Sequence, residues 1–464
     1  MGERTDTRWR VLLAEEGVII RQCVRPVEAG AMTRRRVLLA TAGAAAAGVI
    51  SACAGRAGEA PRPGATQPVK ITWWSNLGDQ HPESQTRVKI IEDFNATHKP
   101  IEVVVEKFGA SLTNIKATIA ADTPPDTYFI AWREGADVFI TGAVADLDTE
   151  LKGDREWADL RRDIFPLMLD TSMWKGKLTS MPIYTNNSIL MWNLDHLRRA
   201  GLREPQTGWS WDDFVDLARR AGRPPDVWGF ELWADSSSFQ SWYGTAGGRL
   251  LDQTKTRVTV NSPEAKETLQ FMLDLSQRHG VSPNPRISTG RSQVFIAGQS
   301  VFEDTGPYRL ADIRKGNISF NAGSRPVHPR KRTRFAGNGG HNLVVTKMKD
   351  AARLKAGLEL AKFMNRPTNQ AKMCILLGTA IPVSRSTLSI KEFVEYGKQD
   401  PQWKACADEA PYGDRAPTLP SIVKMLAALD AAITDVMAGK NSVSAALDGA
   451  QREMQQLLDA DLAL

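Results

Sequence analysis

Strand-like and helix-like hydrophobic patterns follow one another along the chain from residue 69 onward. Residues 69–74 form a β-branched, alternating run that predicts a strand. Residues 83–97 place Val88, Ile91 and Phe94 at helical spacing, which predicts a helix. The same patterns predict strands over 101–108 and 126–132 and a helix over 112–121. Strands that alternate with helices favour an α/β fold with a largely parallel sheet, whose ligands bind beyond the carboxyl ends of strands.

Helix-boundary signals mark four more segments farther along the chain. Ser210, followed three residues later by Asp213, predicts the start of a helix that ends at Gly222. Further helices are predicted from Ser262–Pro263 to Gly280, over 419–437 and over 442–462.

An apolar segment behind three arginines precedes this patterned region. Residues 37–52 form an uncharged run of 16 residues, shorter than the roughly 20 that a membrane-spanning helix needs. The run is typical of a secretory signal peptide, and the arginines at 34–36 resemble a twin-arginine signal, although general secretion signals also begin with arginines. It ends in Ile-Ser-Ala-Cys53, which resembles a bacterial lipobox and predicts lipidation of Cys53. We therefore expect an extracytoplasmic protein, lipid-anchored at the outer face of the cytoplasmic membrane or in the periplasm.

The segments on either side of this signal are predicted to lie outside the folded part. Residues 1–31 are interpreted as an upstream extension, with Met32 as the start of translation, or as a long n-region. Residues 53–68 are rich in Gly, Ala and Pro and predict a flexible tether between lipid and fold.

Size and charge exclude a nucleic-acid-binding function. The chain from Cys53 onward has about 412 residues, enough for two lobes of ordinary domain size. Without the first 52 residues, 51 basic and 48 acidic side chains remain, and a balance so close to neutral argues against nucleic-acid binding. One basic cluster, residues 325–334, contains two prolines and predicts a solvated loop.

Motifs for cofactors, metals and catalysis are missing from the sequence. Cys374 and Cys406 allow one disulfide without implying it, and the six His show no pair at metal-ligand spacing. There is no G-x-G-x-x-G, Walker loop or G-x-S-x-G. We expect no cofactor, no metal and no enzymatic activity.

Short motifs follow one another in a specific order through nearly all of the mature chain. They are Trp-Trp-Ser after the first strand, FNATHKP, PPDTYFIAW, MPIYTNNSILMWNLDHLRRAGL, WSWDDFVDLARRAG, FIAGQSVFEDTGPY, GGHNLVV, AARLKAGLELAKFMNRPTNQ and GTAIPVSRS. Each is loose, but the order closely resembles family 1 extracellular solute-binding proteins of carbohydrate ABC importers. Glu303-Asp304 is a departure, because that family usually carries uncharged residues there.

The resemblance implies two α/β lobes of the periplasmic-binding-protein type with a ligand cleft between them. Crossovers are expected near 184–188, 330–334 and 382–385. The N-terminal lobe would comprise 69–186 and 332–382, and the C-terminal lobe 187–331 and 383–464. Such a protein, most simply a monomer, captures a carbohydrate and delivers it to the membrane permease.

Two alternatives stay open beside carbohydrate binding. The first is a binding protein for glycerol phosphate or another polar solute, which Arg415 would favour because phosphate-binding relatives use an Arg there. The second is a surface-anchored glycoside hydrolase that uses Glu303 or Asp304 with Asp235. It is less favoured because adjacent carboxylates on a strand face opposite sides.

Candidate ligand residues were sought in loops that combine aromatic and hydrogen-bonding side chains. A sugar offers C–H faces to an aromatic plane and hydroxyls to Asp, Asn, Glu and Arg. The predicted ligand-binding residues are Trp74, Asn76, Asp79, Trp132, Glu134, Tyr184, Asn186, Trp233, Asp235, Trp242, Asp304, Tyr308, Gly340 and Arg415. Asn187 and Tyr243 lie in the same segments, and Gly339, Gly340 and His341 are predicted to form a tight loop.

Overall fold

The computed structural model describes residues 68–283, 293–414 and 416–464. The predicted signal peptide, Cys53, most of the tether and Arg415 lie outside these residues. None of the helices within the described ranges is both long enough and apolar enough to cross a membrane.

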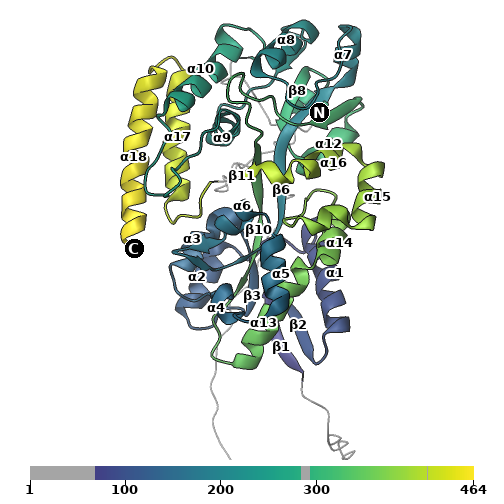
Figure 1. Cartoon of the computed structure of the whole chain (residues 1–464), viewed down its shortest axis with the longest axis vertical. Helices are drawn as coiled ribbons and strands as arrows, with labels where there is room; N and C mark the ends of the chain where they lie inside the picture. Colours follow the sequence, from purple (N-terminus) through teal and green to yellow (C-terminus); the bar gives the residue numbers. More distant parts are fainter. Residues whose placement is uncertain (1–67, 284–292, 415) are drawn as a thin grey trace, which may run out of the picture. The chain divides into compact units, whose positions relative to one another are not determined.

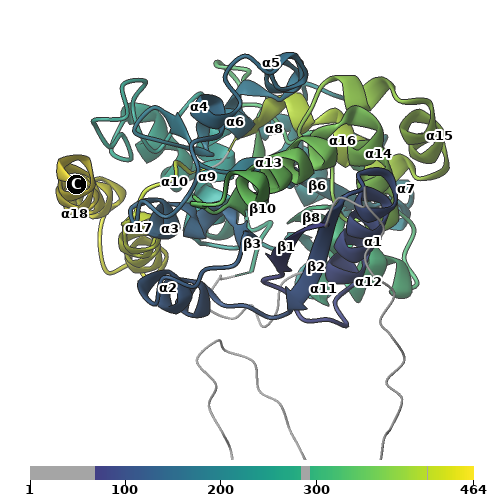
Figure 2. The same ribbon diagram turned by 90° about the horizontal axis from the view of Figure 1, so that it is seen from below.

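A parallel three-stranded sheet begins the fold, as the alternating pattern predicted. β1 (Val69–Trp74) lies between β2 (Ile101–Lys107) and β3 (Thr127–Ala131) and pairs in parallel with both. α1 (Pro82–Thr97) and α2 (Leu112–Ala120) connect these strands, and α13 (Ala351–Asn365) packs against β1. Figure 2 shows α13 beside this group of strands.

A long strand, β6 (Met181–Asn193), takes part in two sets of pairings. Its residues from Met181 to Ser188 pair antiparallel with β10 (Ala336–Val345), which also pairs antiparallel with β3. From Ile189 onward β6 pairs with β8 (Ser300–Thr305) and, from Leu190, with β9 (Phe320–Gly323). Figure 1 shows β6 and β10 running side by side from one group of helices towards the other.

The complete sheet is mixed. Its order is β2-β1-β3-β10-β6-β8-β7, with β9 beside β6 and β11 (Gly413–Asp414) beside β10. Among the described strands, parallel pairing is limited to β1 with β2 and β3, β7 (Trp228–Phe230) with β8, and β10 with β11. The α/β class and the two-lobed fold are confirmed. The two strands that run between the lobes, β6 and β10, pair antiparallel with each other.

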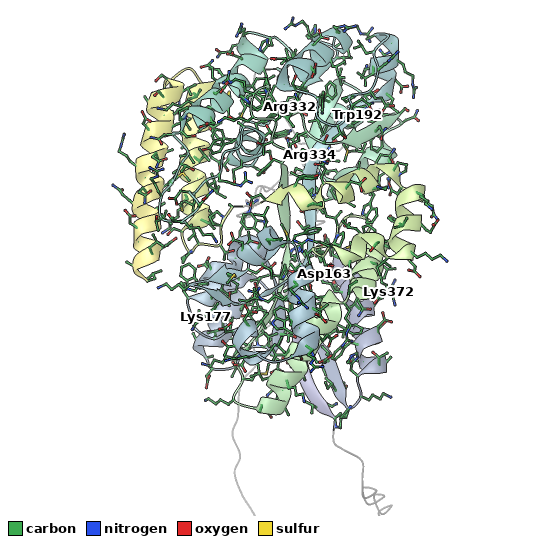
Figure 3. All side chains as sticks on the ribbon, in the orientation of Figure 1. Asp163, Lys177, Trp192, Arg332, Arg334 and Lys372 are labelled. Atoms are coloured by element: carbon green, nitrogen blue, oxygen red, sulfur yellow. The ribbon has the colours of Figure 1, made fainter. Side chains whose placement is uncertain are left out.

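The remaining elements complete the two lobes. They are α3 (Gly135–Phe139), α4 (Leu147–Glu150), α5 (Arg155–Asp163), α6 (Pro166–Asp170), β4 (Met173–Trp174), β5 (Lys177–Leu178), α7 (Leu194–Arg199), α8 (Trp211–Ala221), α9 (Ser236–Thr245), α10 (Pro263–Gln277), α11 (Gln293–Ile296), α12 (Leu310–Lys315), α14 (Pro367–Leu377), α15 (Lys391–Gln399), α16 (Pro401–Asp408), α17 (Ile422–Met437) and α18 (Val443–Ala463). In Figure 3, Asp163 lies among the helices of one lobe and Trp192 among those of the other.

Each lobe is built around a large hydrophobic core. One includes Phe94, Phe129 and Leu360 of the lobe that contains β1–β3. The other includes Trp242 and Ile433 and is closed by α17, which packs along α18 and against α9. Burial of these large side chains is the main favourable contribution to folding.

Sequence signals located the helix boundaries well. Ser210 and Asp213 form a reciprocal capping box at the start of α8, and Gly222 is its C-cap residue. Ser262 caps α10, with Pro263 at its first position, although that helix ends at Gln277, before Gly280.

Two local predictions are wrong. The cluster 325–334 is not solvated throughout. Arg325 is buried and donates through its two terminal guanidinium nitrogens to the Asp304 carboxylate, whereas Arg330 and Lys331 are exposed. Residues 339–341 are not a tight loop, since they lie within β10. In both cases the deciding partner is distant in sequence.

Cys374 and Cys406 are both buried and free.

Candidate functional site

A cavity of about 650 Å³ lies where β6 and β10 face α9 and α17. We call it the central cleft. Its lining residues are Trp132, Arg133, Asn186, Ser188, Asp235, Ser236, Ser237, Gln240, Ser241, Tyr308, Phe335, Gly337, Gly339, Asp414, Ala416, Val423, Leu426, Ala427 and Asp430. They come from both lobes, and the volume lies within the range of ligand pockets.

The floor of the central cleft consists of polar residues on β6 opposite glycines on β10. Asn186 pairs with Gly339 and Ser188 with Gly337, and residues two apart share a face of a strand. A Cβ atom at Gly339 would lie 2.6 Å from Oδ1 of Asn186, and one at Gly337 would lie 2.8 Å from Oγ of Ser241 on α9. The glycines therefore let these polar groups approach the strand pair closely.

Carboxylates form the wall at the start of α9. Asp235 is the N-cap residue and accepts the backbone N–H of Ser238 at 2.8 Å. Asp430 reaches over from α17 and accepts the N–H of Ser236 at 2.5 Å. Negative charge is favourable at a helix N-terminus, so the positive end of α9 holds two carboxylates in the cleft.

Aromatic residues enter the central cleft from turns that follow strands of different lobes. Trp132 follows β3 in the short 3₁₀ turn Trp132–Glu134, and Tyr308 follows β8 in the turn Pro307–Arg309. Trp132 is 7% exposed and packs with the core that contains Trp242, although β3 belongs to the other lobe. It therefore links the lobes at the wall of the central cleft.

Four of the predicted ligand residues meet in this cavity: Trp132, Asn186, Asp235 and Tyr308. The charged residues of its described lining are three carboxylates, from Asp235, Asp414 and Asp430, and one guanidinium, from Arg133. Within the described ranges, no cluster of three or more His, Cys, Asp or Glu residues is placed to hold a metal ion. The arrangement can hold hydroxyl donors and stack C–H faces.

The loop after β1 lies outside this lining. The Trp74 indole donates to Glu106 at 2.6 Å, and Asn76 accepts a hydrogen bond from Arg87 at 3.0 Å. Asp79 is exposed and accepts the N–H of Gln80. These three candidates are engaged within their own lobe.

Tyr184 belongs to a buried polar network beside the cleft. Its hydroxyl donates to Oε2 of Glu83 at 2.6 Å, lies 2.9 Å from Nδ1 of His341 and contacts Arg87. Burial raises the pKa of Tyr184 well above its usual value; the Arg87 charge opposes the rise and the Glu83 charge adds to it. Tyr184 shares a face of β6 with Asn186, so this network positions the floor of the cleft.

Other candidates have structural partners instead of a place in the cleft. Trp242 is fully buried, with its ring centroid 5.9 Å from that of Trp211, and Trp233 is half-buried outside the lining. Glu134 accepts the N–H of Ala131 at 2.9 Å, and Asp304 is paired with Arg325.

Gly340 and Asn187 also have structural roles. Gly340 has φ of +140°, and a Cβ there would lie 2.4 Å from the Tyr184 carbonyl oxygen. Asn187 faces the opposite side of β6 from Asn186 and donates to the carbonyl of Cys406 at 3.1 Å. Arg415 lies outside the described residues.

Several cleft residues were missed by sequence reasoning. Ser236 and Ser237 follow Asp235 directly and Ser241 lies one turn farther along, so the sequence shows a polar start to this helix. Asp430 is an isolated carboxylate within the apolar run MLAALDAAI, which is a usable signal for a buried polar site.

Comparison with known proteins supports this arrangement at the level of the fold. The structure of the cyclic α-maltosyl-1,6-maltose binding protein from Arthrobacter globiformis matches with a TM-score of 0.75 and 21% identity, covering 85% of this chain and 100% of that one. That of UgpB from Mycobacterium tuberculosis in complex with glycerophosphocholine matches with a TM-score of 0.69 and 19% identity, covering 86% and 100%.

Sequence comparison gives the same class of protein. The sn-glycerol-3-phosphate-binding periplasmic protein UgpB of Brucella abortus is 21% identical over 401 residues, covering 82% of this chain and 91% of that protein. The model of the family described as bacterial extracellular solute-binding protein matches residues 89–405, which is more than half of the chain. The chain therefore belongs to the bacterial extracellular solute-binding protein family.

Proposed function

We propose that this protein captures a carbohydrate in the central cleft and delivers it to the membrane subunits of an ABC importer. The observation that carries this proposal is the meeting of Trp132 and Tyr308 with Asn186 and Asp235 in one cavity. Aromatic planes suit the C–H faces of a sugar, and paired acceptors suit its hydroxyls. The Arthrobacter relative named above, a maltosyl-maltose binding protein, supports the same class of ligand.

The proposed mechanism is closure of two lobes over the ligand. We keep the lobes as 69–186 with 332–382 and 187–331 with 383–464. The change of partners within β6 between Ser188 and Ile189 supports the first boundary. A ligand that contacts both lobes favours the closed state by its differential affinity, and the permease then distinguishes loaded from empty protein by shape.

Capture of a phosphate ester is the second candidate. The names of the Brucella and Mycobacterium relatives favour it, and Arg415 is the residue proposed to bind the phosphate. The described lining opposes it: Asp414 is already paired with Arg249, and the remaining charges are the two carboxylates of Asp235 and Asp430 and the guanidinium of Arg133. Like charges within the cleft would weaken binding of an anion.

The remaining features of the proposal concern anchoring and catalysis. Cys53 carries the lipid, which places the protein at the outer face of the membrane, and the protein acts as a monomer without catalysis. The pairing of Asp304 with Arg325 supports the last point, because this carboxylate is buried outside the lining of the central cleft.

A calorimetric titration with sugars and phosphate esters tests the proposal. We expect a neutral saccharide to bind and glycerol 3-phosphate and glycerophosphocholine to bind weakly or not at all. Asn186→Ala should reduce saccharide affinity by about fivefold, since one hydrogen-bonding group is worth roughly 1 kcal/mol. Asn317→Ala, at an exposed site outside the cleft lining, is the matched control. Tight binding of a phosphate ester that depends on Arg415 would establish the second candidate instead.

A further inference from the structure

A second cavity adjoins the central cleft. It has a volume of about 330 Å³ and shares four lining residues with the central cleft: Gln240, Phe335, Asp414 and Ala416. We call it the side chamber. The two cavities therefore adjoin along these four residues.

The walls of the side chamber are mainly apolar. Leu167 lies on one side, Leu250 and Leu251 on the other, and Pro417 beside them. The ring of Tyr243 is fixed in the wall, since its hydroxyl donates to the Thr259 carbonyl at 2.7 Å. Such surfaces suit the C–H face of a sugar ring better than a charged group.

The charged residues around the side chamber are already paired with protein groups. Lys255 pairs with Asp170, and Arg249 pairs with Asp414. Asp252 accepts the backbone N–H of Thr256 at 3.0 Å. Breaking these pairs to bind a charged ligand would cost part of the binding energy, so an uncharged ligand unit fits best.

The side chamber also lies between the lobes. Leu167, on α6, packs against the core that contains Phe94 and Phe129, whereas Leu250 and Leu251 belong to the core that contains Trp242. The Lys255–Asp170 pair joins the same two sides. A ligand unit in the side chamber would therefore contact both lobes.

We propose that the side chamber is a second ligand subsite, which binds an uncharged sugar unit by its C–H face. The ligand is then a disaccharide, a longer oligosaccharide or a glycoside, with one unit in the central cleft and the next between Leu167 and Leu251. This inference rests on the proposed carbohydrate function and names its substrate class.

The test compares saccharides of different length. Glucose and galactose are titrated beside maltose, maltotriose, cellobiose, trehalose and melibiose, with wild-type protein and with Gln253→Trp. Gln253 lines the side chamber and is exposed, so the larger side chain fills the chamber without entering a core. We expect at least one disaccharide to bind about tenfold more tightly than its monosaccharide. Gln253→Trp should remove this gain and leave monosaccharide affinity within about twofold.

Two further variants make the test decisive. Leu167→Trp obstructs the chamber from the opposite side and should also remove the gain in disaccharide affinity. It takes the place of Gln253→Trp in the test if that variant does not fold. Gln399→Trp, at an exposed end of α15 away from both cavities, should change nothing.

The outcomes separate the two proposals. Binding of saccharides with equal affinity at every length, or an equal loss for monosaccharides in both chamber variants, overturns the second subsite alone. If no saccharide binds at all, the proposed function fails and this inference fails with it.

Discussion

At the scale of single residues, the sequence could show which side chains carry suitable chemistry but not which of them face the cleft. Trp132, Asn186, Asp235 and Tyr308 were predicted because they lie in segments where aromatic and polar residues occur together. Trp242 comes from an equally Trp-rich segment, yet its ring packs against Trp211 and Phe214, 31 and 28 residues earlier. Local sequence does not reveal such distant partners.

The buried pair of Asp304 and Arg325 makes a testable prediction at this scale. Their side chains are 6% and 1% exposed, so Asp304→Ala would leave a guanidinium buried without its counter-charge. The free energy of unfolding should fall by about 3–5 kcal/mol, measured by urea denaturation. Replacing both residues together, as Asp304→Leu with Arg325→Met, should recover most of this loss. A small effect of Asp304→Ala on stability combined with a large loss of ligand affinity would instead return Asp304 to the binding site.

At the scale of elements, alternation and capping predicted strands and helices that form mainly from local signals. β1, β2 and β3 and the capping box of α8 are examples. β10 escaped prediction because its glycines at 337, 339 and 340 disfavour a strand on local grounds. It forms because β3 and β6 pair with it on either side, and neither partner is near in sequence.

A cluster of charges fastens α13 to α5. Lys362, whose side chain is 8% exposed, lies 2.8 Å from Oδ2 of Asp154 and 3.1 Å from Oε2 of Glu156. A hydrogen bond from Lys362 lowers the pKa of Asp154, and one from Arg366 lowers the pKa of Glu156. Burial lowers the pKa of Lys362, but hydrogen bonds to neighbouring carboxylates outweigh this and raise it overall.

The lowered carboxylate pKa values predict how this contact depends on pH. Groups with depressed folded pKa values stabilise the protein above their unfolded values of about 4, and the contribution is lost as pH falls through the folded values. Lys362→Met should therefore lower the free energy of unfolding by about 1–2 kcal/mol at pH 7, the partners being partly solvated. The difference from wild type should shrink towards pH 3. Lys355→Met, exposed on the same helix, should differ from wild type by less than about 0.5 kcal/mol at either pH.

At the scale of the whole molecule, the two-lobed fold was predicted through the order of its motifs, because that order runs through nearly the whole chain. The sequence did not show which distant segments of the chain meet in the central cleft. Asp414 and Asp430, from the last quarter of the sequence, line the same cavity as Trp132 and Asn186. Asp430 is placed there by the packing of α17 against α9, and Asp414 by the pairing of β11 with β10, neither of which pattern analysis of one element alone gives.

Ligand should stabilise the whole molecule. At a free saccharide concentration of 100 times the dissociation constant, the stabilisation should be about 2.7 kcal/mol, because ligand binds the folded state alone. Differential scanning calorimetry should show a higher Tm, and tryptophan emission should change because bound ligand lies against Trp132 in the cleft lining. An unchanged Tm at saturating saccharide would contradict capture between the lobes.

The strand β6 also bears on whether the lobes could exist apart. Its first eight residues complete one lobe's hydrogen-bonding ladder and its last five complete the other's. Any cut that gave β6 to one fragment would expose a bare strand edge on the other, and such edges recruit foreign strands. Neither half should therefore be obtainable as a soluble, monomeric fragment.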